Sequence, residues 1–337
     1  MTVTIGIKAL NEEAHIAASL ASAVTAAAPF GGDVVLADSG SRDRTVEIAK
    51  AFPVRIVQLA NVDERCCGAG AQLAFQHAQG DYFYLLDGDM ILDGDFLRAG
   101  IAYLEANPRV GGVGGHVIER NAQGEDFQVR AQKFRAFSGP VDRLDCGGLY
   151  RMAALRELGY FADRNLHAFE EFDLGARLAA AGWTLARIDH PAVEHYGHVT
   201  GGYRLLWRRL ATGYAGGPGE VLRAALGRRH LPVVLRRLRH VHMTILLMAW
   251  WAALVGAGLA GQWWALAGLI VVPVLFFAWR RRSLRLGLYI LAAWNVAALG
   301  SIAALFRPRV SPARPLDAVT LAEPDRTTDQ GEVHAGG

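Results

Sequence analysis

The sequence predicts an α/β domain followed by a helical region that associates with a membrane. From about residue 2 to residue 189, short runs rich in β-branched residues alternate with helical stretches, which is typical of a parallel sheet covered by helices. An arginine-rich segment and three long uncharged apolar runs follow. The composition, with 52% hydrophobic residues and a mean hydropathy of +0.18, excludes a disordered or fibrous protein.

Six strands are expected in the first part, at residues 3–8, 33–38, 54–59, 81–86, 110–118 and 184–189. Between the first two, Asn11 should cap a helix that has Glu12 and Glu13 in its first turn and closes at Pro29, because apolar residues recur there at four-residue steps. Further helices are expected at residues 45–51, 70–79, 95–106, 152–158 and 170–181.

Charge is distributed unevenly along the chain. The first 200 residues contain 18 basic and 26 acidic residues, whereas the remainder contains 17 and 6. A basic region beside long apolar runs indicates a membrane surface and argues against nucleic acid as a partner. Three cysteines are too few for a disulfide framework, and the first residues lack a basic-then-apolar signal region. We therefore expect the first 200 residues to be cytosolic.

Residues 203–240 form a segment of their own, with nine arginines, one acidic residue and interleaved leucine and aromatic residues. This mixture suits amphipathic helices lying on a bilayer, with the arginine stems along the apolar boundary. The alternative is an ordinary solvated basic face.

Three uncharged runs follow at about residues 243–260, 263–279 and 286–306, each near the ~20 residues that cross a bilayer. The first two are short, so a re-entrant hairpin also fits them. Arginines before the first run and between the second and third place those ends in the cytoplasm, which predicts a multi-pass inner-membrane protein with its first 200 residues on the cytosolic face. Residues 307–337 are expected to be disordered, and three crossings would put them outside.

Asp87-Gly88-Asp89 follows a strongly apolar strand and is therefore expected at the carboxyl edge of the sheet, where α/β folds bind ligands. Carboxylates suit Mg²⁺ or Mn²⁺, and such a cation would also hold a diphosphate. The triplet Asp93-Gly94-Asp95 repeats the pattern six residues later, but there an aspartate can cap the following helix. The position at a strand end favours the first triplet.

Four segments of the chain resemble, in order and spacing, the motifs of inverting family-2 glycosyltransferases with the GT-A fold. They are IGIKALNEEAHI, VVLADSGSRDRTVEIA, the Gly-Asp lead into LLDGDM, and EEFDLGARL. The resemblance covers roughly residues 3–200 and implies a catalytic domain over residues 1–202, followed by interface helices at 203–240, transmembrane helices at 241–306 and the tail. The opening departs from the family pattern, because Lys8-Ala9-Leu10 stands where a proline is usual, which puts the nucleotide contacts there in doubt.

The resemblance also implies roles on the donor side. Asp38 would accept a hydrogen bond from the nucleotide base, although an aspartate in DSGS can instead cap its own turn. Asp87 would lie near the ribose and sugar, and Asp89 would be the main ligand of a cation that neutralises the departing diphosphate. The other residues assigned to the nucleotide pocket are Ala9, Asn11, Glu12 and, for phosphate, Arg65, which could equally be a surface charge.

In EEFDLGARL, Glu171 stands where the family has its general base. Asp173 is the competitor, but Asp173 and Arg177 are four residues apart on one helical face and could form an ion pair instead. We favour Glu171, with Glu170 beside it on the acceptor side. A base must reach the acceptor hydroxyl as it attacks the anomeric carbon.

Two further sets of residues follow from the resemblance. His195, with His198 as its competitor, would help to hold the metal or the diphosphate. Gly147 and Gly148 would allow the backbone to approach the sugar closely on the acceptor side.

The function expected from these features is metal-dependent transfer of a hexose from a UDP-, GDP- or dTDP-sugar to a hydroxyl of a lipid-linked or membrane-proximal glycan acceptor, in polysaccharide or glycolipid assembly. A polyprenyl-phosphate sugar transferase is the alternative, although a phosphate acceptor needs no base. A processive synthase would need a Gln-x-x-Arg-Trp segment, which the chain lacks. A non-enzymatic membrane scaffold fits poorly with four retained acidic site residues.

Overall fold

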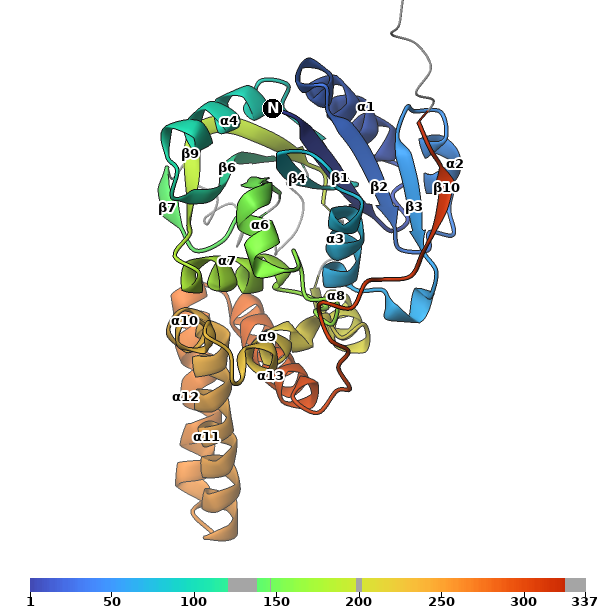
Figure 1. Ribbon diagram of the computed structural model, residues 1–337. Helices are drawn as coiled ribbons and strands as arrows, with labels where there is room; N and C mark the ends of the chain where they lie inside the picture. Colours follow the sequence, from blue (N-terminus) through green and yellow to red (C-terminus); the bar gives the residue numbers. More distant parts are fainter. Residues whose placement is uncertain (121–137, 146, 198–201, 325–337) are drawn as a thin grey trace, which may run out of the picture.

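The computed structural model describes residues 1–120, 138–145, 147–197 and 202–324, and contains one sheet with helices on both faces and a helical extension below it (Figure 1). The strands follow the order β10-β3-β2-β1-β4-β8-β6-β9-β5, and β7 also pairs with β9. They are β1 (Val3–Ala9), β2 (Asp33–Asp38), β3 (Arg55–Leu59), β4 (Tyr82–Asp87), β5 (Met90–Leu92), β6 (Val110–Glu119), β7 (Gly139–Val141), β8 (Gly148–Arg151), β9 (Thr184–His195) and β10 (Ala318–Ala322).

The predicted parallel strands lie side by side in one half of the sheet. β3, β2, β1 and β4 are mutually parallel, so their carboxyl ends meet at one edge. The other half mixes directions, because β8 runs antiparallel between β4 and β6. The short strands β5, β7, β8 and β10 were not predicted, since three to five residues carry too little periodicity to be recognised.

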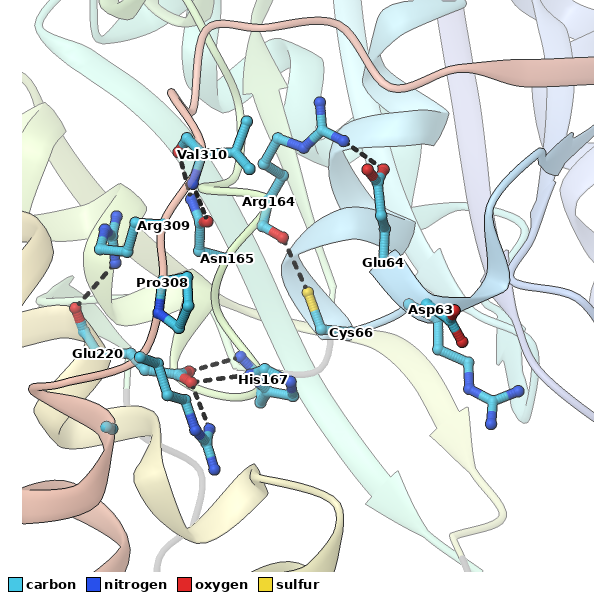
Figure 2. Close-up of a pocket in the computed structure, with 13 residues that line it drawn as sticks. Asp63, Glu64, Cys66, Arg164, Asn165, His167, Glu220, Pro308, Arg309 and Val310 are labelled. Atoms are coloured by element: carbon cyan, nitrogen blue, oxygen red, sulfur yellow. Dashed lines mark hydrogen bonds and ion pairs between the residues drawn. The ribbon is translucent and has the colours of Figure 1, made fainter.

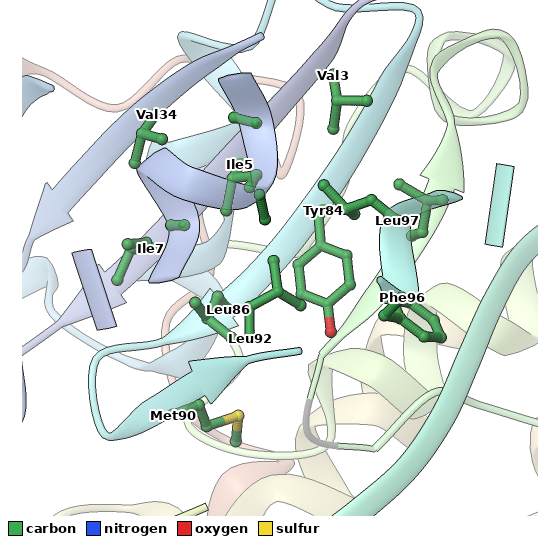
Figure 3. Close-up of a cluster of buried hydrophobic side chains, with 14 of the residues drawn as sticks. Val3, Ile5, Ile7, Val34, Tyr84, Leu86, Met90, Leu92, Phe96 and Leu97 are labelled. Carbon is green, nitrogen blue, oxygen red and sulfur yellow. The ribbon is translucent and has the colours of Figure 1, made fainter. Parts of the chain in front are cut away.

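The sheet separates two hydrophobic cores because successive strand residues point to opposite faces. Figure 3 shows one of them, which contains Ile5 and Ile7 of β1 and in which Tyr84 of β4 lies next to Phe96 of α4 (Phe96–Ala106). Helix α1 (Ile16–Ala27) covers the same face. The opposite face is covered by α3 (Cys67–Gln76), α6 (Met152–Leu158) and α7 (Glu170–Ala180), while α2 (Thr45–Ala49) packs beside α1.

The predicted start of the first helix was wrong. Asn11 has a positive φ of 58° and lies in the loop before the helix, which begins at Ile16 after His15. The Asn11 side chain instead accepts a hydrogen bond from the backbone N–H of Arg42 at 2.8 Å. Asparagine tolerates this left-handed conformation better than most residues, so it fastens the loop rather than capping the helix.

The interface segment consists of α8 (Gly202–Ala211), α9 (Gly217–Ala225) and α10 (Leu231–Arg237). Val221 of α9 and Val234 of α10 are fully buried in a third core with Leu166 and Phe172 of the α/β domain. These helices therefore belong to the body of the molecule on one side, while Trp207 of α8 is 72% exposed on the other.

Three long apolar helices follow, α11 (Arg239–Leu259), α12 (Trp263–Arg281) and α13 (Leu284–Ala304). Each is long and apolar enough to cross a membrane, in agreement with the three runs predicted from the sequence. In Figure 1, α11 and α12 form a hairpin whose far end projects away from the remainder of the molecule, whereas α13 packs against the near part of this hairpin and against α9.

The expectation of a disordered tail was wrong for residues 307–324. β10 extends the sheet by pairing antiparallel with β3, and Leu316 before it is buried (Figure 1). The backbone N–H of Leu316 donates to Oε1 of Gln76 at 2.8 Å. A polar, proline-containing segment is held here because β3 would otherwise be a sheet edge with unpaired backbone groups. Residues 325–337 lie outside the described part of the chain.

Candidate active site

The predicted donor-side residues come together at the carboxyl edge of the parallel strands. In the register of the sheet, Ala9 of β1 is the partner of Asp38 of β2, and Lys8 is the partner of Asp87 of β4. Three neighbouring strands thus deliver two carboxylates and a partly buried lysine to one edge. The sequence predicted the two acids but assigned no role to Lys8.

Asp38 is fully buried, and its two oxygens differ. Oδ2 accepts hydrogen bonds from the backbone N–H groups of Gly40 and Ser41, at 3.0 and 2.9 Å, and from Nε2 of Gln58 at 2.8 Å. Oδ1 is buried and accepts no hydrogen bond from any described residue. Asp38 can therefore cap its turn and bind a ligand at the same time, because the two roles use different oxygens. A buried acceptor without a hydrogen bond destabilises the folded state until a donor reaches it.

Glu12 approaches the Asp-Gly-Asp triplet from the loop after β1. A Cβ placed on Gly88 would lie 3.0 Å from Cγ of Glu12, so the two segments are in close contact. Burial raises the pKa of Glu12 to about 7, and the neighbouring carboxylates Asp89 and Asp87 raise it in the same direction. The site is therefore rich in negative charge and suited to a cation.

Asp89 faces His195 because β5 and β9 pair antiparallel, with Met90 opposite His195. Nε2 of His195 lies 3.4 Å from Oδ2 of Asp89, and its Nδ1 lies 2.7 Å from Oε1 of Glu119. Burial alone would lower the pKa of His195, but the hydrogen bonds with Asp89 and Glu119 raise it to about 10. Glu119 was not predicted; it orients the histidine in the way that outer carboxylates orient metal-binding histidines.

Asp89 and His195 fit a divalent cation in their chemistry, one as a carboxylate and one as an imidazole. Within the described ranges, no group of three or more His, Cys, Asp or Glu side chains is arranged to hold a metal. A cation here would consequently need further oxygen ligands from a bound diphosphate or from water.

Lys8 links the donor-side acids to α7. Its Nζ lies 2.8 Å from Oε1 of Glu170 and 3.3 Å from Oδ1 of Asp87. Burial lowers the pKa of Lys8, but the nearby acids outweigh burial and hold it well above its usual value. The pKa of Asp87 is raised, chiefly by burial and against the effect of Lys8. A buried charge of this kind persists only when paired, so Lys8 compensates the acidic cluster.

Glu171 lies in the first turn of α7, beside Glu170. Its pKa is raised to about 8, chiefly by burial and also by the charge of Glu170, while Lys8 opposes the shift. The preceding residue, Phe169, has a φ of 68°, an uncommon conformation for a non-glycine residue, and it sets the direction in which α7 begins. A carboxyl group that titrates near neutral pH is suited to general-base chemistry.

Asp173 points into a different environment. Its Oδ2 accepts a 2.7 Å hydrogen bond from Nε of Arg177, and the Arg177 guanidinium stacks over the ring of Tyr160 at 4.1 Å. Nε2 of His230 lies 3.7 Å from the other Asp173 oxygen. Asp173 thus forms the ion pair with Arg177 that the sequence offered as the alternative to catalysis. Its carboxylate is also only 1% exposed.

The remaining predicted residues are less closely tied to this cluster. A Cβ on Gly147 would lie 2.7 Å from the backbone oxygen of Leu85, and one on Gly148 would lie 2.6 Å from Cδ1 of Leu144, so their close approaches are to the protein itself. Arg65 is exposed, as are Gly94 and Asp95 of the second triplet. His198 lies outside the described residues.

The chain is similar to known glycosyltransferases in sequence and in fold. Residues 4–159 match the family model described as "Glycosyl transferase family 2". A mannosyltransferase of Pyrobaculum calidifontis, solved with GDP-Man and Mn²⁺, is 21% identical with a TM-score of 0.60, over 89% of this chain and 86% of that one. No curated protein sequence matches the chain.

Staphylococcus aureus TarS is similar in fold as well. The TarS 1–349 structure with UDP-GlcNAc is 15% identical with a TM-score of 0.50, over 90% of this chain and 91% of that one. A second TarS structure is 16% identical with a TM-score of 0.50, and the match covers 68% of this chain but only 43% of that longer chain. These likenesses establish a shared fold.

Proposed function

We propose that the chain is a family 2 glycosyltransferase of the GT-A type, with three long apolar helices after its α/β domain, and that it transfers a sugar from a nucleoside-diphosphate sugar to a hydroxyl group. The acceptor that we propose is lipid-linked or membrane-proximal, and the catalytic domain lies on the cytosolic face of the inner membrane. The observation that carries the proposal is the acidic cluster at the carboxyl edge of β1, β2 and β4, next to the first turn of α7.

The donor is assigned to the edge formed by β1 and β2. The orphaned Oδ1 of Asp38 is an acceptor for an N–H group of a nucleotide base, while Oδ2 keeps the turn closed. Ala9 ends β1, Asn11 and Glu12 lie in the loop that follows it, and Asp87 is available to the ribose and sugar. The two solved relatives hold GDP-Man and UDP-GlcNAc, so a nucleoside-diphosphate sugar is the class of ligand common to both.

Asp89 and His195 are the residues that would hold Mn²⁺ or Mg²⁺, with Glu119 orienting the histidine. Such a cation supplies Lewis-acid stabilisation of the departing nucleoside diphosphate. The mannosyltransferase structure contains Mn²⁺ together with its donor, which supports a cation of this kind.

Glu171 is assigned as the general base that takes the proton of the acceptor hydroxyl. A base must be ionised to act, and a carboxyl group with a pKa near 8 holds the accepted proton well at neutral pH. Lys8 and Glu170 position this turn and balance its charge. Asp173 is not assigned a catalytic role, because its carboxylate is already bound to Arg177.

A polyprenyl-phosphate sugar transferase is the second candidate. The arginine-rich segment and the apolar helices would suit a lipid phosphate, but such an acceptor is already ionised and gains little from Glu171.

The test uses the full-length protein in detergent with a panel of UDP-, GDP- and dTDP-sugars, with and without Mn²⁺ or Mg²⁺. We expect hydrolysis of one donor class that depends on the cation, and faster turnover with a hydroxyl-bearing lipid-linked glycan. Turnover with a polyprenyl phosphate alone would support the second candidate, and no turnover of any donor would contradict both.

A further inference from the structure

Both ends of α13 lie on the side of the catalytic domain, although this helix is as long and apolar as α11 and α12. At its start, Ser283 caps the helix by accepting a hydrogen bond from the backbone N–H of Leu286 at 3.3 Å. This cap directly follows Arg280–Arg282 at the end of α12, and Arg280 lines the same cavity as Met243 at the start of α11. Leu238, which joins α10 to α11, is buried in the third core together with Leu166 and Phe172 of the α/β domain. The start of α13 is therefore near that domain.

The last turns of α13 pack against the interface helices. A Cβ on Gly219 of α9 would overlap the backbone of Ser301, and one on Gly300 would lie 2.8 Å from the backbone of Ala215. Just beyond the helix, Nη1 of Arg307 lies 2.7 Å from Oε1 of Glu220. Helices approach this closely only where both carry small residues, so this end of α13 is firmly seated.

The chain after α13 stays on the catalytic domain. Figure 2 shows Arg309 and Val310 beside Asn165, and the backbone N–H of Val310 donates to Oδ1 of Asn165 at 2.8 Å. Arg309 pairs with Asp163, and the carbonyl of Arg314 accepts a hydrogen bond from Arg164. Several of these residues line a cavity of about 180 Å³. The chain then continues into β10, which pairs with β3 of the sheet.

The segment between α13 and β10 is too short to cross the bilayer back to the catalytic domain. It comprises residues 305–317, which is shorter than the ~20 helical residues that cross a bilayer, and it is anchored to the domain along its length. If α13 crossed the membrane, its far end and β10 would lie on opposite sides, which this path does not allow.

The hairpin of α11 and α12 has the features of a membrane-crossing element. Within its most apolar window α12 is 0% buried and α11 is 11% buried, against 28% for α13. Exposed tryptophans stand at both ends of α12, with Trp264 93% exposed near the turn and Trp279 77% exposed near the arginines. Aromatic residues concentrate at the two interfaces of a bilayer in this manner. By contrast, Trp294 and Asn295 lie at the centre of α13, where Oδ1 of Asn295 binds Nε1 of Trp251 at 2.9 Å.

The exposed face around α13 suits the headgroup region of one leaflet. Leu299 is 52% exposed, Phe306 is 80% exposed, and Trp207 of α8 adds a 72% exposed ring. The chain has no acidic residue between Glu220 and Asp317, whereas arginines recur throughout the helical ends. Apolar and aromatic side chains flanked by arginines bind the boundary between acyl chains and anionic headgroups.

We propose that, within the described residues, only α11 and α12 cross the bilayer, and that α13 lies in the leaflet facing the catalytic domain. The chain then crosses twice, and its C-terminal tail returns to the side of the active site. This replaces the three crossings expected from the sequence, which put the tail on the opposite side. The inference does not depend on the proposed transfer reaction.

The experiment places a protease recognition site in the full-length chain at one of three positions: before Met1, between Gly261 and Gln262, or after Gly337. Each variant is digested in sealed membrane vesicles of both orientations. We expect the two terminal sites to be cut in the same vesicles, with loss of the full-length band, and the Gly261 site to be cut only in vesicles of the opposite orientation. Cleavage of the terminal sites in opposite vesicles, or of the Gly261 site together with both termini, would overturn the proposal.

A second measurement avoids insertions and leaves the chain length unchanged. Ala318 of β10 is the register partner of Leu59 of β3, so the double variant Leu59→Cys, Ala318→Cys should form a disulfide when native membranes are oxidised. Each single variant is the control. Absence of the disulfide in a double variant that stays in the membrane fraction and elutes as a single species in detergent would overturn the docking of the tail, and with it the argument for α13.

Discussion

At the scale of single residues, the proposed active site holds several partly or fully buried charges that balance one another. Lys8 lies within reach of Asp87 and Glu170, while Glu171 has its pKa raised to about 8 by burial and by Glu170. Removing one member of such a set leaves the others uncompensated. Substitutions here should therefore change the pH dependence of the reaction as well as its rate.

Glu171→Gln removes the proposed base with almost no change in volume. Transfer should fall by about 10²–10⁴-fold, while donor affinity stays nearly unchanged. Because a base acts when ionised and its pKa is raised, the wild-type rate should climb as pH increases through about 8, and this limb should vanish in the variant. Profiles of kcat/KM against pH, with Asp95→Asn as the control, check this. Near-normal transfer by Glu171→Gln would favour a phosphate acceptor.

Lys8→Met should move the same pH limb. Lys8 lowers the pKa of Glu171, so its removal should shift the rise in rate to higher pH, by about one unit or more for a buried neighbouring charge. The measurement is the pH profile at saturating donor. A uniform loss of rate with an unmoved profile would mean that Lys8 serves only the packing of the site.

Asp89→Asn keeps the shape of the side chain but removes the charge that would hold a cation. Turnover should be nearly abolished, and donor binding should lose its dependence on Mn²⁺ or Mg²⁺. Asp95→Asn is the matched control, since it alters the exposed second triplet and should change activity little. Donor affinity measured with and without cation, together with turnover, checks both variants; equal losses at the two positions would contradict the assignment.

At the scale of elements, α7 serves two purposes on two of its faces. Its first turn presents Glu170 and Glu171 to the site, and its next turn buries Asp173 against Arg177. Arg177 in turn donates to the backbone oxygens of Tyr160 and Phe161. The ion pair thereby fastens the helix that carries the proposed base.

Asp173→Asn should lower the free energy of unfolding by about 3–5 kcal/mol, because it leaves the Arg177 charge buried and uncompensated. The double variant Asp173→Asn, Arg177→Met should lose less than the single one, since no charge is then left unpaired. Denaturant unfolding in detergent measures both. A double variant as unstable as the sum of its parts would contradict a coupled pair.

At the scale of the whole molecule, the catalytic sheet and the membrane region are joined twice. The third core connects α9 and α10 to Leu166 and Phe172, and the tail connects α13 back to β3. Along the chain, the α11–α12 hairpin lies between these two attachments, and it projects from the body of the molecule (Figure 1). If the hairpin crosses a membrane as proposed, these two attachments would hold the α/β domain at a defined place on the membrane surface.

The full-length protein should remain with the membrane fraction after washing with concentrated salt and with alkaline carbonate, and detergent should release it. The reason is that the protein itself buries almost none of the most apolar stretches of α11 and α12. Immunoblots of pellet and supernatant check this. Release by salt alone would mean that only the arginine-rich helices attach the protein, through screened charge.

Much of the fold was accessible from the sequence because it depends on local patterns. The strands at Asp33–Asp38 and Tyr82–Asp87 and the helix at Met152–Leu158 were expected within one residue of their observed bounds, since β-branched runs and helical spacing are visible in a short window. The three apolar helices were recognisable for the same reason. The short strands β5, β7 and β8 were not, because their positions depend on partners distant in the chain.

The sequence by itself determined the α/β alternation, the apolar helices and the identity of the acidic residues at the strand ends, since strand ends and charge are properties of consecutive residues. Only the tertiary structure decided which of those acids meet. The pairing of β5 with β9 brings His195 to Asp89, the register of β1 with β4 brings Lys8 to Asp87, and the ion pair with Arg177 occupies Asp173. It also decided that the tail returns to β3, because an unpaired sheet edge can be satisfied by a segment of five residues that is too short to be recognised as a strand by itself.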